Sequence, residues 1–371
     1  MVFQVEADFL NWGVPMPLAT NRMSSSTSIL PRSLAADVRQ MILTARQEVA
    51  RTVDAGLVTL YWHVGQRVRR DILQLKRAEY GEQIVSALGR QLSVEFGRGF
   101  DEKSLRHMIR FAEAFNDEAI VSALRRQLTW THFKALAYVE DDLKRDFYAE
   151  MCRIERWNTR TLSEKIRSML FERTALSKRP DKLARLEIQK LREQDKLSPD
   201  LVFRDPYVLD FLGLKDIYAE KDLEAAIIRE IESFILELGV GFTFVARQKR
   251  IVIDGEDYHL DLLFYHRKLQ RLIALDLKIG EFVAADKGQM ELYLIWLTRH
   301  EREPHESEPL GIILCAGKRR EHIELLEPSE SGIHVASYLT HLLPKAQLEQ
   351  KLHDSVQLAR ASFQRRGTES P

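Results

Sequence analysis

The sequence predicts an α+β protein with two domains: an all-α, helix-turn-helix-like N-terminal domain and an α/β domain with a central mixed sheet. Residues 34–172 show helical periodicity almost throughout, with few glycines and no proline. After residue 200 the pattern changes to an amphipathic helix, three strand-like runs, a second helix and further apolar strands. Strands mixed with helices in this order are typical of an α/β domain.

The length and composition fit two globular domains in a reducing compartment. The chain has 371 residues, of which 45% are hydrophobic and 30% charged. No run approaches the roughly 18 consecutive apolar residues of a transmembrane helix, and the first residues lack the basic start of a secretory signal. Cys152 and Cys315 form no metal-ligand spacing. We therefore expect a cytoplasmic protein without a membrane partner or structural zinc.

The net charge of zero conceals an asymmetry between the two halves. Residues 1–180 contain 28 Lys and Arg against 22 Asp and Glu, whereas residues 181–371 contain 27 against 33. A basic half joined to an acidic half fits a nucleic-acid-binding module attached to a domain with functional carboxylates.

Composition and periodicity divide the chain into five predicted segments. Residues 1–32 form an expected disordered tail, in which Met23 is an alternative start to Met1. The other segments are a helical domain over 33–175, a charged linker with a solvated helix over 176–200, an α/β domain over 201–345, and a C-terminal helix and tail over 346–371. Helices are predicted over 34–65, 80–96, 101–115, 131–137, 143–153 and 161–171, with Ser33, Asp101, Thr131 and Thr161 as N-caps.

Residues 80–115 have the pattern of a helix-turn-helix. A flexible turn, Gly97-Arg98-Gly99, separates two helices, and the second carries an apolar stripe. Its other side is basic, where a recognition helix would face a DNA groove. The basic residues are Lys103, Arg106, His107 and Arg110. The alternative is a pair of packed helices with a solvated basic face.

The α/β domain is predicted from alternating apolar runs and turn residues. One amphipathic helix ends at Gly239 and Gly241. The run PLGIILCAG predicts a strand buried on both faces, as in parallel pairing. The other predicted elements are strands over 242–253, 258–266, 271–279 and GIHVASYL, and helices over 284–299 and 346–363.

Charged residues interrupt two of these strands. Asp261 lies in HLDLLFYH, and Asp276 and Lys278 lie in LIALDLKI at a spacing of two, which places both on one strand face. Two carboxylates from adjacent strands, with the Leu277 carbonyl as a further oxygen ligand, suit Mg²⁺ or Mn²⁺. Such an ion activates water for attack on a phosphate, and the lysine adds positive charge.

Gln289, on the following helix, is placed to reach the same edge of the sheet and orient water or phosphate. A structural alternative is that Asp276 and Lys278 form an ion pair at a strand end while Asp261 caps a turn. The short D-x-K spacing occurs by chance and does not decide between the two. The order of the surrounding helices and strands favours a site.

This order and the D…DxK pattern resemble the PD-(D/E)xK nuclease superfamily. More narrowly, LEAAIIREIESFILELGVGFTF, HLDLLFYH, LIALDLKIGEF and KGQMELYL are similar to the YhcG-type family of bacterial two-domain proteins. The helical half is similar to the N-terminal domain of that family in YWHVGQRV, GFDEKSLRHMIRFAEAF, LTWTHF and RWNTRTLSEKI. The resemblance covers most of the chain except residues 1–32 and the C-terminal tail.

The resemblance implies a restriction-endonuclease-like fold for residues 201–345 and an intact nuclease site. The implied set is Asp261 and Asp276 as metal ligands, Lys278 and Gln289 as catalytic residues, and Glu224, preferred over Glu230, as the acid of the first helix. The motif that contains Asp276 and Lys278 is D-x-K here, whereas many members have E-x-K. Both forms belong to the superfamily pattern.

We therefore expect a Mg²⁺- or Mn²⁺-dependent endonuclease that hydrolyses DNA and binds it through its N-terminal domain. The resemblance implies mobile-element, restriction-linked or phage-defence settings, with components of such systems as partners, and paired cuts in a duplex would favour a homodimer. Two alternatives stay open: a non-catalytic DNA-binding or complex-assembly protein with a nuclease fold, and an RNA-directed nuclease.

Overall fold

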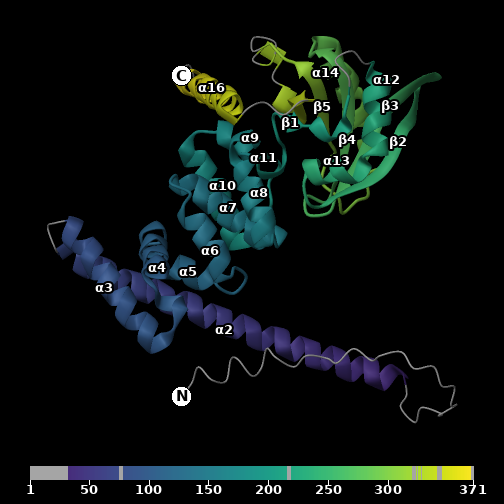
Figure 1. Cartoon of the computed structure of the whole chain (residues 1–371). Helices are drawn as coiled ribbons and strands as arrows, with labels where there is room; N and C mark the ends of the chain where they lie inside the picture. The colour runs from purple at the N-terminus through teal and green to yellow at the C-terminus, as the bar shows by residue number, and fades with distance from the viewer. Residues whose placement is uncertain are drawn as a thin grey trace. The chain divides into compact units, whose positions relative to one another are not determined.

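The computed structural model describes residues 32–74, 78–214, 219–319, 323, 325–326, 328–340 and 345–368. The chain divides into two compact units, residues 1–51 and 52–371. The helix α2 (Arg32–Gln74), purple in Figure 1, begins in the first unit and continues into the second. The predicted disordered tail lies outside the described residues except for Arg32. Among the residues described, no helix is long and apolar enough to cross a membrane.

Helices form nearly all of the described chain up to residue 202, as the periodicity predicts. After α2 they are α3 (Ala78–Phe96), α4 (Glu102–Ala114), α5 (Glu118–Leu124), α6 (Trp130–Ala137), α7 (Asp142–Glu155), α8 (Thr159–Arg167), α9 (Leu170–Arg173), α10 (Asp181–Gln194) and α11 (Pro199–Val202). The sequence did not predict the short α5, which Asp117 caps by accepting the backbone N–H of Ala119 at 2.8 Å.

One of the four predicted N-caps is confirmed. Asp101 accepts the backbone N–H of Ser104 at 2.7 Å at the start of α4. The other three are wrong, because α2 already includes Ser33, and α6 and α8 begin before Thr131 and Thr161. At α8 the cap is Asn158, whose side chain accepts the N–H of Thr161 at 2.9 Å.

The predicted helix-turn-helix segment forms the packed pair α3 and α4, joined by a short 3-10 turn over Arg98–Phe100. The buried stripe of α4 consists of Leu105, Met108, Phe111 and Ala112. A side chain at Gly65 of α2 would meet the backbone carbonyl of Met108, so α2 and α4 cross closely at this point. Glycine is required there because a Cβ has no space.

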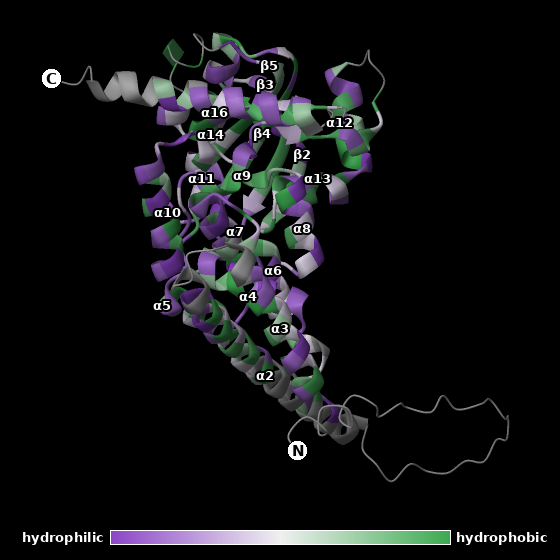
Figure 2. Cartoon of the chain, turned by 60° about the vertical axis from the view of Figure 1, so that its left-hand side comes forward, coloured by the Kyte–Doolittle hydropathy of each residue, from purple (hydrophilic) through white to green (hydrophobic). Residues whose placement is uncertain are grey.

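The predicted charged linker is instead part of the folded core. α10 buries Ala184, Ile188 and Leu191, and its purple and green residues alternate in Figure 2. Arg192 of α10 also lies 2.7 Å from the buried carboxylate of Glu150 on α7. The prediction of a solvated helix is wrong because the narrow apolar stripe of this helix lies among many charged residues and is difficult to recognise in the sequence.

The second part of the chain forms a six-stranded mixed sheet in the order β1-β6-β5-β4-β3-β2. β2, β3 and β4 are antiparallel neighbours, whereas β4, β5, β6 and β1 are parallel neighbours. The strands are β1 (Tyr207–Val208), β2 (Phe242–Ile253), β3 (Glu256–His266), β4 (Arg271–Glu281), β5 (Leu310–Gly317) and β6 (Ile333–Leu339). The mixed sheet and the buried parallel strand β5 confirm the prediction.

Helices cover both faces of this sheet (Figure 1). α12 (Glu220–Arg229) and α13 (Ile231–Leu238) share one apolar core with Leu262 and Leu275, and α14 (Ala284–His300) shares another with Leu263 and Ala274. The sequence predicted a single helix where α12 and α13 lie. Glu230 interrupts it without a glycine or proline to signal the break. The last described helix is α16 (Lys345–Thr368).

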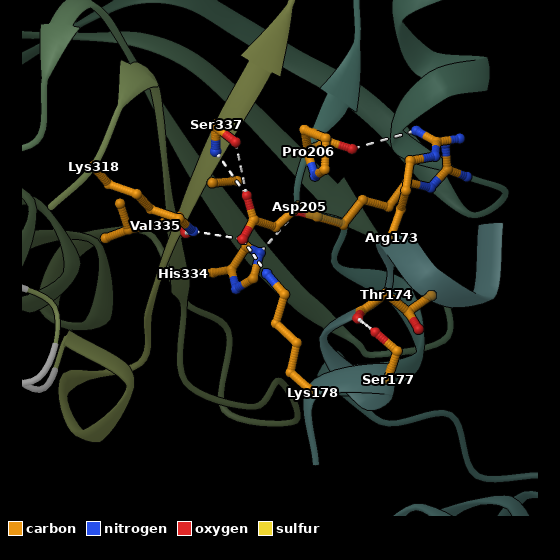
Figure 3. A network of polar contacts seen from close by, with 12 residues as sticks. Arg173, Thr174, Ser177, Lys178, Asp205, Pro206, Lys318, His334, Val335 and Ser337 are labelled. Atoms are coloured by element: carbon orange, nitrogen blue, oxygen red, sulfur yellow. Dashed lines mark hydrogen bonds and ion pairs between the residues drawn. The ribbon is translucent and has the colours of Figure 1, made fainter. Parts of the chain in front are cut away.

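A buried polar network fastens the short helix η2 (Ala175–Lys178) to the sheet (Figure 3). The Asp205 carboxylate binds Lys178 and Lys318, and it accepts hydrogen bonds from the backbone N–H and hydroxyl of Ser337 at 2.9 and 3.0 Å. Burial alone would raise the pKa of Asp205, but the two ammonium groups hold it well below its usual range. The paired and hydrogen-bonded charge is therefore tolerated in the interior.

Candidate active site

The two aspartates lie where β3 and β4 separate. Paired residues of β3 and β4 run from His266 opposite Arg271 to Leu262 opposite Leu275, and Asp261 and Asp276 would be the next pair. From there β4 continues its pairing with β5 only. Instead of a ladder bond, the Leu277 N–H donates to Asp261 Oδ2 at 2.8 Å. The fork in the sheet therefore brings the two carboxylates together.

Asp276 is buried, and Lys278 lies beside it on the same strand. Lys278 Nζ is 2.8 Å from Asp276 Oδ2, so the buried carboxylate has an ammonium group as its partner. Burial, and the nearby Asp261 carboxyl, raise the pKa of Asp276 to about 7 against the opposing effect of Lys278. Burial lowers the pKa of Lys278, but the Asp276 carboxylate outweighs this and raises it.

Asp261 is half-buried and receives two hydrogen bonds. Its Oδ1 accepts the Gln248 side-chain amide at 3.0 Å, while its Oδ2 accepts the Leu277 N–H. Burial raises the pKa of Asp261, these two hydrogen bonds oppose the rise, and the charge of Glu224 adds to it. The structural alternative is therefore half correct: the ion pair of Asp276 exists, but Asp261 does not cap a turn.

Glu224 approaches the fork from α12. It is buried, and its Oε1 accepts a hydrogen bond from Arg247 Nε of β2 at 2.6 Å. Glu230 lies at the break between α12 and α13, beside Arg229 at 3.6 Å. Of these two acids, Glu224 is the one whose charge contributes to the raised pKa of Asp261. Sequence reasoning missed Arg247, because an arginine in an exposed strand carries no local signal.

Glu220 is a second acid on α12 that the sequence did not single out. It lies one helical turn before Glu224, and its Oε1 accepts the backbone N–H of Ile279 at 3.2 Å. Its charge also contributes to the raised pKa of Lys278. The four-residue spacing of Glu220 and Glu224 on one helix face was the available signal.

Gln289 lies on α14, on the face of the sheet that bears Asp276. Its amide donates to the Tyr293 hydroxyl at 2.6 Å, and that hydroxyl donates to the His259 carbonyl at 3.2 Å. Burial raises the pKa of Tyr293, and the charges of Asp276 and Asp261 contribute. The structure thus places Gln289 near the acids but bonds it to Tyr293. The four-residue spacing from Gln289 on one helix face could have indicated Tyr293.

The residues at the fork fit a hard divalent cation. They offer two carboxylates, and the charge of Asp261 contributes to the raised pKa of Asp276. A strand residue directs its N–H and C=O to the same edge, so the Leu277 carbonyl faces the Asp261 side. The described residues contain no group of three or more His, Cys, Asp or Glu at metal-binding distance. Mg²⁺ commonly takes one or two carboxylates and keeps several waters, so the set is sufficient.

The predicted DNA-binding face lies on α4. Its residues are Lys103, Arg106, His107 and Arg110. Arg106 is exposed and pairs with Glu102 at 2.8 Å, whereas Arg110 Nε donates to the Ala137 carbonyl at 3.2 Å. His107 Nδ1 lies 2.8 Å from the Tyr138 hydroxyl. The face is thus basic and accessible at Lys103 and Arg106, while the other two also support packing.

The two histidines of β3 have different surroundings. His266 is fully buried, its Nδ1 accepts the Leu269 N–H at 3.1 Å, and burial lowers its pKa to about 4. It therefore serves the packing of the β3–β4 turn. His259 contributes its backbone carbonyl to the chain of hydrogen bonds through Tyr293.

Two domain families match the two parts of this chain. The YhcG PDDEXK nuclease domain matches residues 200–355. The DUF1016 N-terminal domain matches residues 37–173. Two solved structures are also similar: a repair endonuclease from Pyrococcus abyssi (19% identity, 33% of this chain, 49% of that chain, TM-score 0.24) and an EndoMS–dsDNA complex (18%, 35%, 49%, 0.26). The chain spans about half the length of each, and at TM-scores this low the two structures support no conclusion about this chain.

A curated relative covers both parts together. The Escherichia coli (strain K12) protein described as "Putative nuclease YhcG" is 33% identical over 326 residues, which are 80% of this chain and 86% of the relative. The six-stranded sheet lies within the residues that match the nuclease domain, and α3 to α8 lie within those that match the N-terminal domain. This chain therefore belongs to the YhcG family, whose C-terminal part is a PD-(D/E)xK nuclease domain.

Proposed function

We propose that the protein is a divalent-metal-dependent endonuclease that hydrolyses phosphodiester bonds of DNA. The observation that carries this proposal is the convergence of Asp261, Asp276 and Lys278 at the fork. Burying two carboxylates side by side costs free energy unless a cation or protons neutralise them. The Lys278 ammonium at 2.8 Å offsets the charge of Asp276, and a divalent cation would neutralise both carboxylates.

The proposed roles follow from the position of each side chain. Mg²⁺ or Mn²⁺ bound by Asp261, Asp276 and the Leu277 carbonyl would supply Lewis acidity and a water of lowered pKa. Lys278 holds a positive charge beside the attacked phosphate. The hydrogen bond from Gln289 to Tyr293 leaves the Gln289 carbonyl oxygen to orient water. Glu224, next to Asp261, orders water or a second cation.

The decisive test is cleavage by the full chain. Plasmid, linear and branched DNA and an RNA of matched sequence are incubated with Mg²⁺, Mn²⁺ or EDTA. We expect metal-dependent cleavage of DNA that Lys278→Ala and Asp276→Ala reduce by about 100-fold or more. Lys190→Ala, on the exposed face of α10, serves as the matched control and should retain wild-type rates.

Four outcomes would contradict parts of this proposal. Wild-type rates in Lys278→Ala would remove the lysine from the mechanism, and cleavage in EDTA would exclude metal dependence. Preferential cleavage of RNA would change the substrate class. DNA binding without cleavage by any metal-loaded form would favour the non-catalytic alternative.

We further propose that the exposed face of α4 binds the DNA backbone. Lys103 and Arg106 supply charges that phosphates attract, whereas the nuclease half is acidic. The slope of log affinity against log salt is negative, and each phosphate contact removed should make it shallower by about 0.9. The measurement is a salt titration of DNA binding by Lys103→Ala and Arg106→Ala in EDTA. Unchanged slopes would place the DNA contacts elsewhere.

A further inference from the structure

A strained residue lies opposite a catalytic aspartate. Gln248, within β2, has a left-handed backbone with φ of 47°. This conformation is unfavourable for a residue with a Cβ and is most common in turns or helix ends. Asp254 and Gln270 adopt it in the turns that join the strands. Among the described residues other than glycine, Gln248 is the one that has this left-handed conformation inside a strand.

The β2–β3 ladder has a bulge between Phe244 and Ala246, and it is interrupted again at Gln248. The pairing passes from Arg247 opposite Leu262 to Lys249 opposite Leu260, and Gln248 and Asp261 between them complete no ladder pair. Leu260 belongs to the same core cluster as Leu263, three residues later, so the strict alternation of β3 is also broken around Asp261. This second irregularity is therefore centred on the Gln248–Asp261 pair.

The Gln248 side chain uses this irregularity to contact Asp261. Its amide donates to Oδ1 at 3.0 Å, and the Leu277 N–H from β4 donates to Oδ2 at 2.8 Å. With one donor on each oxygen, the carboxylate cannot rotate about its Cβ–Cγ bond without losing a hydrogen bond. Gln248 is exposed, so burial does not fix its side chain.

We propose that Gln248 is a positioning residue that fixes the Asp261 carboxylate for metal binding and cleavage. This inference rests on the proposed function, since it assigns Gln248 to the same site. Outer hydrogen bonds to metal ligands orient them, and their loss typically costs 10- to 100-fold in metal affinity or activity. A strained backbone held at a reactive site fits this role better than a role in stability.

The test compares two glutamines with the same backbone conformation. Gln248→Gly removes the donor and relieves the strain, and Gln248→Glu keeps the length but replaces the donor with an acceptor. Gln270→Gly relieves the same strain in the β3–β4 turn, away from the site, and is the matched control. We measure kcat and KM for DNA cleavage, the Kd for Mn²⁺ by calorimetry, and the thermal midpoint, on the full chain.

We expect both Gln248 variants to lose about 10- to 100-fold in kcat and to bind Mn²⁺ about 10-fold more weakly, with KM for DNA unchanged. Gln270→Gly should match the wild type in both, and the thermal midpoint of Gln248→Gly should not fall below that of Gln270→Gly. Wild-type kcat and Mn²⁺ affinity in Gln248→Gly would overturn the proposal. A loss confined to Gln248→Glu would also overturn it, since the added charge would then be the cause.

The outcomes separate this inference from the function on which it rests. If the wild type cleaves no nucleic acid, the proposed function fails, and the Mn²⁺ affinities still show whether Gln248 positions Asp261. If the wild type cleaves and Gln248→Gly is unaffected, only the positioning role fails.

Discussion

Replacing Asp276 with asparagine should abolish cleavage yet stabilise the metal-free protein at alkaline pH. Asp276 is 3% exposed, and the folded-state pKa of its carboxyl is raised from 3.8 to about 7. A raised pKa means that folding favours the protonated acid, so its stabilising contribution is complete below pH 3.8 and is lost as the pH rises through about 7. Asparagine keeps the shape and removes this dependence.

The magnitude follows from the size of the shift. One pKa unit corresponds to about 1.4 kcal/mol, so between pH 5 and pH 8 the wild type should lose about 2 to 3 kcal/mol of unfolding free energy that the variant keeps. Lys278 stays charged over this range. Its attraction to the ionised Asp276 carboxylate is already contained in the pKa of about 7, so it adds no separate contribution to the difference.

The assay is urea unfolding in EDTA at pH 5, 6, 7 and 8, followed by circular dichroism. Asp257→Asn, at an exposed position of the β2–β3 hairpin, controls for the exchange of aspartate for asparagine. Equal pH slopes in the wild type and Asp276→Asn would refute the reasoning. Adding Mg²⁺ at pH 8 should stabilise the wild type and not the variant, because an ion that binds the folded state alone raises its stability.

Two further predictions follow from single contacts. Gly65→Ala should destabilise the helical part by about 2 kcal/mol or more, since the added Cβ meets the Met108 carbonyl. Gly56→Ala on the same helix has open space around it and should stabilise the protein by about 0.5–1 kcal/mol. Thermal unfolding distinguishes the two variants, and equal effects would contradict the close crossing of α2 and α4. Tyr293→Phe should lower kcat by about 10-fold with unchanged KM, because the Gln289 amide loses its hydrogen-bond acceptor. The measurement is steady-state cleavage, and an unaltered kcat would show that Gln289 does not need the hydrogen bond to Tyr293.

The order of the helices and strands could be predicted from the amino-acid pattern alone. Periodicities of 2 and 3.6 and turn residues are local, so β2, β4, β5 and α14 are found close to their predicted bounds. The charged residues Asp261, Asp276 and Lys278 were also visible, since charges inside apolar strands stand out. Their D…DxK pattern led to the family that the comparison with the Escherichia coli relative confirms.

Contacts between residues distant in the chain were decided by the tertiary structure. The fork that joins Asp261 to Asp276 depends on where the β3–β4 ladder ends, which is a matter of packing on both sheet faces. The burial of α10 and the break at Glu230 likewise depend on partners elsewhere in the chain. Gln248 is the clearest case, because glutamine carries no signal for a left-handed backbone and only the surrounding sheet imposes one.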